Sequence, residues 1–274
     1  MNIAQGQPKV DVAILIDSVS RKTELRCQER LKRTTEVTQH QSILVYEGVL
    51  SVEALLDKGQ RQILDFFLPR DIVCMYPLMI HPKISIRAIT KTSLLNLDDN
   101  TEGQLVRQPE LYDLLMTQRQ TQLSRAYIHQ FMIGYLDGEA RVVSFLFALA
   151  MRGSSPRSCV VLDVPMSRDD VADYLAMNRD TLSRIFARLE SSGLIERMNR
   201  HAIRIGDLDE IARRTPIAKL ISAACIPRQS WAYVHQLMSR HAGRETNCCV
   251  SSHASVEQRP GATQGIGNLD LRTA

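Results

Sequence analysis

Two short amphipathic segments joined by a tight turn span residues 166–195, and this pattern constrains the fold more than any other part of the chain. Ser167 is a favourable N-cap for the first segment, and Asp170, three residues later, completes an acidic variant of the capping box. The apolar face of this segment comprises Val171, Ala172 and Leu175. The sequence therefore predicts a short capped helix that packs on one side only.

A second helix is predicted after the turn Ala176-Met177-Asn178, because Asn178 is also a good N-cap. Its apolar side chains recur at three- and four-residue spacing and are Leu182, Ile185, Phe186 and Leu189. The opposite face carries Asp180, Ser183, Arg184 and Arg188, with Arg179 at its edge. Gly193 is placed to end the helix, since glycine commonly follows the last helical turn. Two helices joined in this way are typical of a helix-turn-helix DNA reader.

The exposed face of the second helix has the chemistry that reads a major groove. Arginine can donate two hydrogen bonds to O6 and N7 of guanine, and a carboxylate can accept one from the cytosine amino group. Serine can contact a base edge or a phosphate. The alternative is a solvated helix surface on which Asp180 and Arg184 form an i,i+4 ion pair. The capped first helix, the short turn and the hairpin that follows favour the DNA reader.

A β-hairpin is predicted directly after the second helix. Short strands at residues 194–195 and 202–205 flank a polar turn at residues 198–201. The residues at the tip of this wing are Arg197, Arg200 and His201. Cationic side chains at such a tip can contact phosphate groups, which contributes affinity and salt dependence rather than sequence choice.

The composition permits a DNA-binding protein and argues against several other classes. A length of 274 residues can hold one large domain or two small ones, and a formal net charge of +4 fits a binder that concentrates its positive charge. The six cysteines are scattered without a C-x-x-C pair, so neither a disulfide framework nor a metal module is indicated. The apolar run Val10–Ile16 is too short for a membrane span and lacks a signal-peptide cleavage site. A cytoplasmic protein without membrane contact is expected.

Short β-type runs dominate the region that precedes the helices. They lie at residues 42–46, 51–56, 62–67, 72–76, 84–90 and 93–97, with glycine and proline between them. This spacing predicts a small antiparallel barrel or sandwich over residues 25–102, preceded by a loosely ordered arm at residues 1–24. Together with the helices that follow, it predicts an α+β fold.

A long helix is predicted to follow the barrel in residues 103–138 and to end at a hinge, Leu136-Asp137-Gly138. Its apolar stripe fits a dimer interface or, alternatively, ordinary packing in the core. Residues 139–215 are predicted to form the DNA-binding domain. The C-terminal extension at residues 216–274 is expected to be largely disordered from about residue 243, because its composition is polar and glycine-rich.

The order of barrel, long helix, hinge and winged helix-turn-helix is similar to the cyclic-AMP receptor and fumarate–nitrate regulator (Crp/Fnr) superfamily of bacterial transcription factors. The match is strongest in PMSRDDVADYLAMNRDTLSRIFARLESSGLI, which most resembles the Fnr/FixK branch, where a pattern of the type E-T-V-S-R marks the recognition helix. FFLPRDIV at residues 66–73 resembles the barrel strand and turn of the family. YLDGEARVVSFLFALA at residues 135–150 resembles its hinge and next helix. The resemblance covers about residues 25–215.

The resemblance implies roles for individual residues. Arg184 would read guanine, and Ser183 would contact a neighbouring thymine or a phosphate. Asp180 stands where the family usually has the longer glutamate, and Arg179 stands where Fnr-like members usually have an apolar residue. The full set of candidate DNA contacts is Ser167, Asn178, Arg179, Asp180, Ser183, Arg184, Arg188, Arg200 and His201.

The resemblance also implies partners. A homodimer would place two recognition helices in successive major grooves of a near-palindromic site, about one helical turn apart. The family favours an activator, and residues 60–71 lie where such proteins often touch RNA polymerase. An enzyme is not expected, because His81 is the only histidine in residues 41–98 and the chain has no phosphate-binding or triad motif.

The usual effectors of the family are not predicted from the residues present. Cyclic-nucleotide binders use a Gly-Glu pair and an Arg-Ser/Thr pair, where this chain has Cys74-Met75 and Pro82-Lys83. An iron–sulfur cluster needs four ligands, and Cys27 and Cys74 alone do not provide them. No cofactor is therefore predicted, although haem stays open.

The haem hypothesis depends on an axial ligand, for which His40, His81 and His129 are candidates. A lone histidine is more often a surface or core residue. Cys159 precedes the helix-turn-helix and is expected to be a buried, inert thiol. The alternative function is an effector-gated sensor, in which a small ligand or haem in the barrel controls DNA binding.

Overall fold

The structure is a computed structural model, and it describes residues 21–31, 42–55, 59–75, 83–97, 109–153 and 159–224. The predictions for the N-terminal arm up to residue 20, for His40 and His81, and for the tail from residue 243 lie outside the described residues. All described residues belong to one unit, Met1–Met238.

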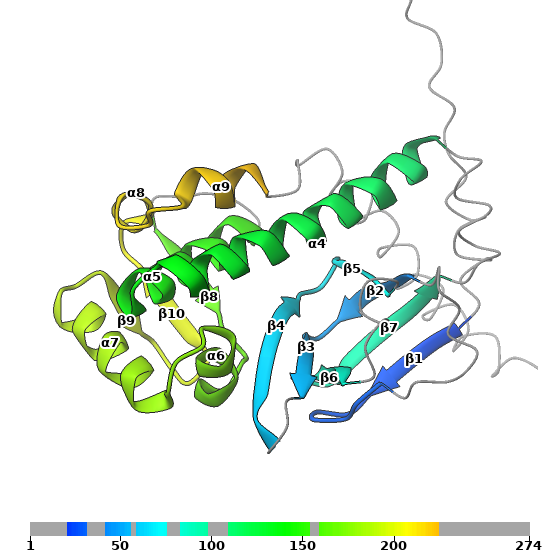
Figure 1. The fold of residues 1–274 in the computed structure, drawn as a ribbon, viewed down its shortest axis with the longest axis horizontal. Helices are drawn as coiled ribbons and strands as arrows, with labels where there is room; N and C mark the ends of the chain where they lie inside the picture. The colour runs from blue at the N-terminus through cyan, green and yellow to red at the C-terminus, as the bar shows by residue number, and fades with distance from the viewer. Residues whose placement is uncertain are drawn as a thin grey trace, which may run out of the picture. The chain divides into compact units, whose positions relative to one another are not determined.

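The strands between residues 21 and 97 form two antiparallel sheets (Figure 1). One sheet has the order β1 (Arg21–Leu25), β7 (Thr92–Leu97), β2 (Ser42–Glu47) and β5 (Ile72–Cys74). The other has the order β4 (Arg61–Phe67), β3 (Leu50–Leu55) and β6 (Ile84–Ala88). A shared apolar core joins the two sheets, and its most buried members include Val45, Val52, Phe67 and Leu94. The predicted sandwich-like β domain is confirmed.

The turn between β2 and β3 requires glycine at residue 48. Gly48 has φ +82°, and a Cβ there would lie 2.3 Å from the carbonyl oxygen of Lys91. Any other residue would meet both a strained backbone and a clash with a neighbouring chain segment. This turn carries the chain from one sheet to the other, so Gly48 fixes a corner of the sandwich.

The six strands predicted between residues 42 and 97 are confirmed, with boundaries that differ by at most two residues. Strand β1 is not predicted by the sequence, because RKTEL is charged and has one large apolar residue. It lies at the edge of its sheet and pairs with β7. Charged side chains are common on edge strands, where they discourage pairing with another chain. Residues 21–24 therefore belong to the sheet rather than to an arm.

A long helix, α4 (Pro109–Tyr135), follows the β domain, and α5 (Gly138–Arg152) follows the hinge. Asp137 caps α5, since its Oδ1 accepts a hydrogen bond from the backbone N–H of Ala140 at 2.8 Å. The predicted hinge is therefore confirmed as a helix boundary. Among the described residues, no helix combines the length and apolarity needed to cross a bilayer.

The remaining elements form a winged helix-turn-helix. They are β8 (Val160–Asp163), α6 (Arg168–Tyr174), α7 (Arg179–Ser191), β9 (Ile195–Arg197), β10 (Ala202–Ile205), α8 (Leu208–Arg213) and α9 (Ala218–Ala223). The three strands form one antiparallel sheet in the order β8-β10-β9. Its apolar core is continuous with α5 and with Ile63 and Phe66 of β4, so the DNA-binding part packs directly on the β domain. The predicted α+β fold is confirmed.

Candidate nucleic-acid interface

The first helix of the helix-turn-helix, α6, begins with the predicted capping box. The Ser167 hydroxyl accepts a hydrogen bond from the backbone N–H of Asp170 at 3.1 Å. The backbone N–H of Ser167 in turn donates to Oδ2 of Asp170 at 3.2 Å. The helix starts where the sequence predicts, because both bonds satisfy N–H groups that have no partner within the helix.

The turn places the second helix, α7, with its apolar face inward. Ala176 has a φ of 51°, a left-handed conformation that reverses the chain within three residues. The Oδ1 atom of Asn178 accepts a hydrogen bond from the backbone N–H of Thr181 at 2.7 Å, which confirms the predicted N-cap. The four predicted core residues, Leu182, Ile185, Phe186 and Leu189, are all buried. Gly193 follows the helix with φ +72°, as its predicted role requires.

Every residue predicted to lie on the opposite face of α7 is exposed, namely Arg179, Asp180, Ser183, Arg184 and Arg188. Arg179 pairs with Asp169 at 3.6 Å, and Arg188 pairs with Glu139 at 3.4 Å. Both pairs lie at the surface, where such contacts contribute little and can exchange for phosphate. Within the described residues, no ion pair joins Asp180 to Arg184, so the i,i+4 pair of the alternative reading is not formed. These two side chains stay available for base edges.

The wing has the predicted hairpin, but its cations differ in availability. Arg197 is held by Glu190, to which its Nε donates at 2.6 Å, and this pair raises the pKa of Arg197 above its usual value. His201 is exposed, with Nδ1 at 3.4 Å from the carbonyl oxygen of Val164. Arg200 is exposed at the turn without a salt bridge to any described residue. Arg200 is therefore the wing residue best placed to reach a phosphate.

Two of the predicted contacts already use part of their polar atoms within the protein. The exposed Ser167 hydroxyl lies 2.7 Å from Oδ2 of Asp170 as well as accepting from its N–H. Asn178 uses its Oδ1 for the cap and keeps its amide N–H groups for a phosphate oxygen. Both residues lie at helix N-termini, where phosphates commonly bind.

Arg168 is a residue that sequence reasoning missed. Its guanidinium lies 3.9 Å from the centre of the Phe186 ring, so it packs α6 against α7 through a cation–π contact. Burial chiefly, and the nearby Arg197 secondarily, lower the pKa of Arg168 from its usual value. The sequence gives no signal for this contact, because the two residues lie 18 positions apart on different helices.

Sequence reasoning also missed a group of charged residues where the sheet β4-β3-β6 meets α6. We call Glu53, Arg61, Arg87, Asp170 and Asp173 the inter-domain ion cluster. Glu53 and Arg87 stand in strands β3 and β6 and are 0% and 4% exposed. The one signal in the sequence was the presence of charged residues within strands whose other side chains are mostly apolar or small.

Most of residues 60–71 are covered by the helix-turn-helix, by α4 and α5, or by the core of the β domain. The side-chain amide of Gln62 donates to the backbone carbonyls of Asp173 and Tyr174. Phe66 lies 5.2 Å from Tyr174, measured between ring centres. Within this fully described segment, Gln60 and Pro69 are the exposed residues. A polymerase contact at this segment would therefore have few side chains to use in this arrangement.

The cysteines and histidines that the structure describes show no arrangement that holds a metal. Cys27 and Cys159 are exposed, and Cys74 is buried. The prediction that Cys159 is buried is wrong, because it lies next to a strand, β8, of which only Leu162 is buried. His129 is buried, donates from Nε2 to the carbonyl oxygen of Tyr174 at 2.7 Å, and stacks on the Tyr174 ring. Among the described residues, no three His, Cys, Asp or Glu side chains gather into a metal-binding group.

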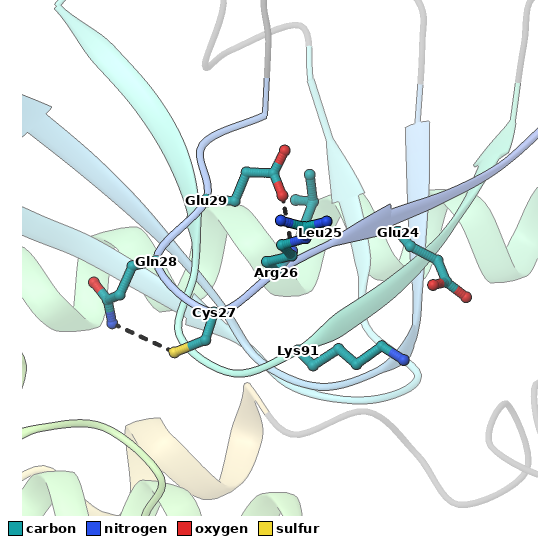
Figure 2. A pocket seen from close by; sticks show the side chains of 7 residues that line it. All are labelled: Glu24, Leu25, Arg26, Cys27, Gln28, Glu29 and Lys91. Carbon is teal, nitrogen blue, oxygen red and sulfur yellow. Dashed lines mark hydrogen bonds between the residues drawn. The ribbon is translucent and has the colours of Figure 1, made fainter.

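A surface hollow beside β1 is lined by residues 24–29 and Lys91 (Figure 2). Figure 2 shows the Cys27 sulfur turned toward the Gln28 amide, with Glu24 near the amine end of Lys91. Glu29 accepts a hydrogen bond from the backbone N–H of Arg26 at 2.9 Å. The charges of this hollow are mixed and engaged locally, so it does not have the convergent donors that a nucleotide phosphate requires.

Comparison with known proteins agrees with this geometry. Residues 140–214 match the Crp-like helix-turn-helix domain. The nitrogen fixation regulation protein FixK of Bradyrhizobium diazoefficiens is 32% identical over 157 residues, which are 55% of this chain and 64% of that protein. FixK of Rhizobium meliloti is 32% identical over 151 residues, which are 55% of this chain and 67% of that protein. The chain thus spans slightly less than two thirds of the first relative and two thirds of the second.

Two further similarities extend over more of the chain. The transcriptional activator protein FnrA of Stutzerimonas stutzeri is 28% identical over 195 residues, which are 68% of this chain and 77% of that protein. The solved structure of FixK2 from Bradyrhizobium japonicum shares the fold, with a TM-score of 0.60 and 23% identity over 70% of this chain and 96% of that chain. The resemblance seen in the sequence is thereby confirmed, and the enzyme class is excluded by family. The chain belongs to the Crp/Fnr family of DNA-binding transcription regulators.

Proposed function

We propose that the protein is a transcription activator that binds a near-palindromic DNA site as a homodimer. The observation that carries this proposal is the exposed face of α7, on which Asp180, Ser183 and Arg184 have no partner among the described residues. Arg184 would donate to guanine, and Asp180 would accept from a cytosine amino group. Arg200 would add a phosphate contact from the wing.

The dimer is supported by an unusual stripe on α4. Leu123, Tyr127, Phe131 and Tyr135 lie at four-residue spacing and are 55%, 63%, 40% and 80% exposed. The predicted apolar stripe is in fact divided between two faces, since Leu115 and Met132 are buried. A large apolar stripe on the surface of one chain favours pairing with the same stripe of a second copy.

Activation and an RNA polymerase partner are also proposals. FnrA carries the description of a transcriptional activator, and this chain is similar to it over most of its described length. In the observed arrangement a polymerase contact within residues 60–71 would use the exposed Gln60 and Pro69. Like other DNA-binding regulators, the protein would act where the chromosome is, in the cytoplasm.

We further propose that DNA binding requires no cofactor. The hollow of Figure 2 has mixed charge, and His129 already uses its Nε2 for the Tyr174 carbonyl. A buried cyclic phosphate or a haem iron would need donors or ligands of another kind. DNA binding by the purified protein without added nucleotide tests this point, and its visible absorption spectrum tests for haem or an iron–sulfur cluster; we expect full binding and no visible band.

Native mass spectrometry of the full chain with a duplex that carries two half-sites tests the dimer. We expect two chains on one duplex, and Tyr127→Glu should shift the protein to one chain by placing a charge in the stripe. The control is Lys219→Gln, an exposed substitution away from the stripe that also lowers the net charge by one. A single wild-type chain bound with full affinity would contradict the proposal.

A further inference from the structure

Glu53 and Arg87 lie on the face of the sheet β4-β3-β6 that points away from the core of the β domain. Val52, Ile86 and Ala88 point into the core of the β domain. Because side chains alternate along a strand, Glu53 of β3 and Arg87 of β6 point to the opposite side. Burial on that side needs other residues, and these come from two places. Asp170 of α6 contacts Arg87, whereas Gln28 and Arg30, which follow β1, contact Arg87 and Glu53.

The inter-domain ion cluster joins this face to α6 through two arginines. Nη2 of Arg87 lies 2.7 Å from Oδ1 of Asp170, and Nη2 of Arg61 lies 2.9 Å from the same oxygen. Arg61 also reaches Asp173, with Nη2 at 2.6 Å from its Oδ2. Glu53 completes the cluster, since it pairs with Arg87 and lies 3.3 Å from Nη1 of Arg61. Two helix carboxylates are thus held by two guanidinium groups that belong to the sheet.

Asp170 divides its two oxygens between two tasks. Oδ2 accepts from the backbone N–H of Ser167 and thereby caps α6. Oδ1 accepts from both arginines of the sheet. Burial would raise the pKa of this carboxyl, but the bonds from Ser167 and Arg87 outweigh that effect and hold the pKa below its usual value. The group that starts the helix is therefore the group that fixes it to the sheet.

The position of α6 determines the position of the recognition helix. Arg168 of α6 stacks on Phe186 of α7, and both helices share one apolar core. The cluster is directional, because a guanidinium fork accepts a carboxylate in few geometries. The ring contact of Phe66 with Tyr174 and the hydrogen bonds of Gln62 also join β4 to α6. The cluster adds charge-assisted bonds whose direction is fixed by both the guanidinium and the carboxylate.

We propose that the inter-domain ion cluster is a positioning device that sets the angle of the recognition helix relative to the β domain, and hence the half-site spacing that the dimer accepts. The inference rests on the proposed dimeric function. It assigns Arg61, Arg87, Asp170 and Asp173 to spacing selectivity rather than to base reading, since none of them lies on the exposed face of α7. A looser cluster should leave the preferred bases unchanged and broaden the accepted spacings.

The test uses the full chain and duplexes with two preferred half-sites whose centres are separated by about 10 base pairs, or by one or two pairs more or fewer. The variant is Arg61→Gln, which removes the bonds to Asp170 and Asp173. The matched control is Arg30→Gln, because Arg30 pairs with Glu53 at 3.4 Å, is half exposed and has no bond to α6. Both variants lose one positive charge, so a general change in DNA affinity cancels in the comparison.

We expect wild type and Arg30→Gln to favour one spacing by about tenfold, and Arg61→Gln to reduce this preference to about threefold or less, a change of about 0.7 kcal/mol or more. Base preference within a single half-site should be the same in all three proteins. An unchanged spacing preference in Arg61→Gln would overturn the inference, as would an equal loss of base and spacing preference. If Arg61→Gln does not fold, Asp173→Ala removes the carboxylate at the other end of the same bond and is judged by the same criterion. A wild-type protein without any two-fold site would overturn the proposed function itself.

Discussion

The two helices of the helix-turn-helix differ in whether their key polar side chains have partners within the protein. On α7 the polar face is exposed, and Asp180 and Arg184 have no partner among the described residues. On α6 Asp170 is buried and uses both oxygens for partners inside the protein. Free hydrogen-bonding groups suit a surface that will meet DNA, whereas satisfied ones suit a surface that must keep its place. Reading of DNA and positioning of the motif are thus assigned to different helices. We call the exposed face of α7 the reading side and the inter-domain ion cluster on α6 the positioning side.

The largest effect is expected on the free energy of unfolding, when the central arginine of the inter-domain ion cluster is replaced. Arg87→Met leaves Glu53 and Asp170 buried without their main cation, which costs about 3–5 kcal/mol when one partner of a buried pair is removed. Urea denaturation measures the free energy of unfolding. Arg30→Gln should change it by less than about 1 kcal/mol, because Arg30 is half exposed. Similar losses in both variants would show that the burial of the cluster has little energetic weight.

The next effect concerns the reading side. Arg184→Ala should cost about 1–3 kcal/mol of specific binding per half-site and relax base choice there. Stability should change little, since the side chain is exposed. Fluorescence anisotropy with matched and mismatched duplexes checks this expectation. If affinity fell by the same factor for every sequence, Arg184 would be a phosphate contact rather than a base reader.

A smaller effect is expected at the wing. Arg200→Ala should weaken binding to all sequences nearly equally and reduce the salt slope of log K by about 1. Arg197→Ala offers a contrast, because Arg197 is held by Glu190 and should change the slope less. Titrations at several salt concentrations separate the two. An effect of Arg200→Ala confined to one base position would contradict its assignment to phosphate.

The smallest effect concerns pH. Burial chiefly lowers the pKa of His129, despite the Tyr174 carbonyl and Asp65, which favour the charged form. The unfolded chain then binds a proton near pH 6.5 before the folded protein does, so stability is present above about pH 6.5 and falls as the pH drops below it. His129→Gln should lose this dependence while keeping a donor for the carbonyl. Parallel slopes of stability against pH in both proteins between pH 7 and 5 would refute the assignment.

The reading side could be predicted from sequence because its signals are local. Capping residues, apolar spacing and a glycine stop lie within 30 residues, and the structure confirms them at Ser167, Asn178 and Gly193. The strands of the β domain followed from short β-type runs and from the glycine and proline between them in the same way. Strand β1 was not predicted, because an edge strand does not need an apolar pattern.

The positioning side could not be predicted, because it depends on residues far apart in the chain. Arg87 and Asp170 are 83 positions apart, and no local sequence pattern links the two. The capping box accounts for Asp170 by itself, so nothing in the sequence signals a second task. Cys159 shows the same limit on a smaller scale, since the apolar sequence of β8 beside it does not reveal that only Leu162 of that strand is buried.

The measurement that tests the central claim most directly is selection of preferred duplexes from a random pool by the full chain, without added effector. We predict one enriched site with two-fold symmetry, a guanine in each half-site that Arg184→Ala no longer selects, and a single dominant spacing. Enrichment of asymmetric or unrelated sequences, or an Arg184→Ala profile identical to wild type, would contradict the account.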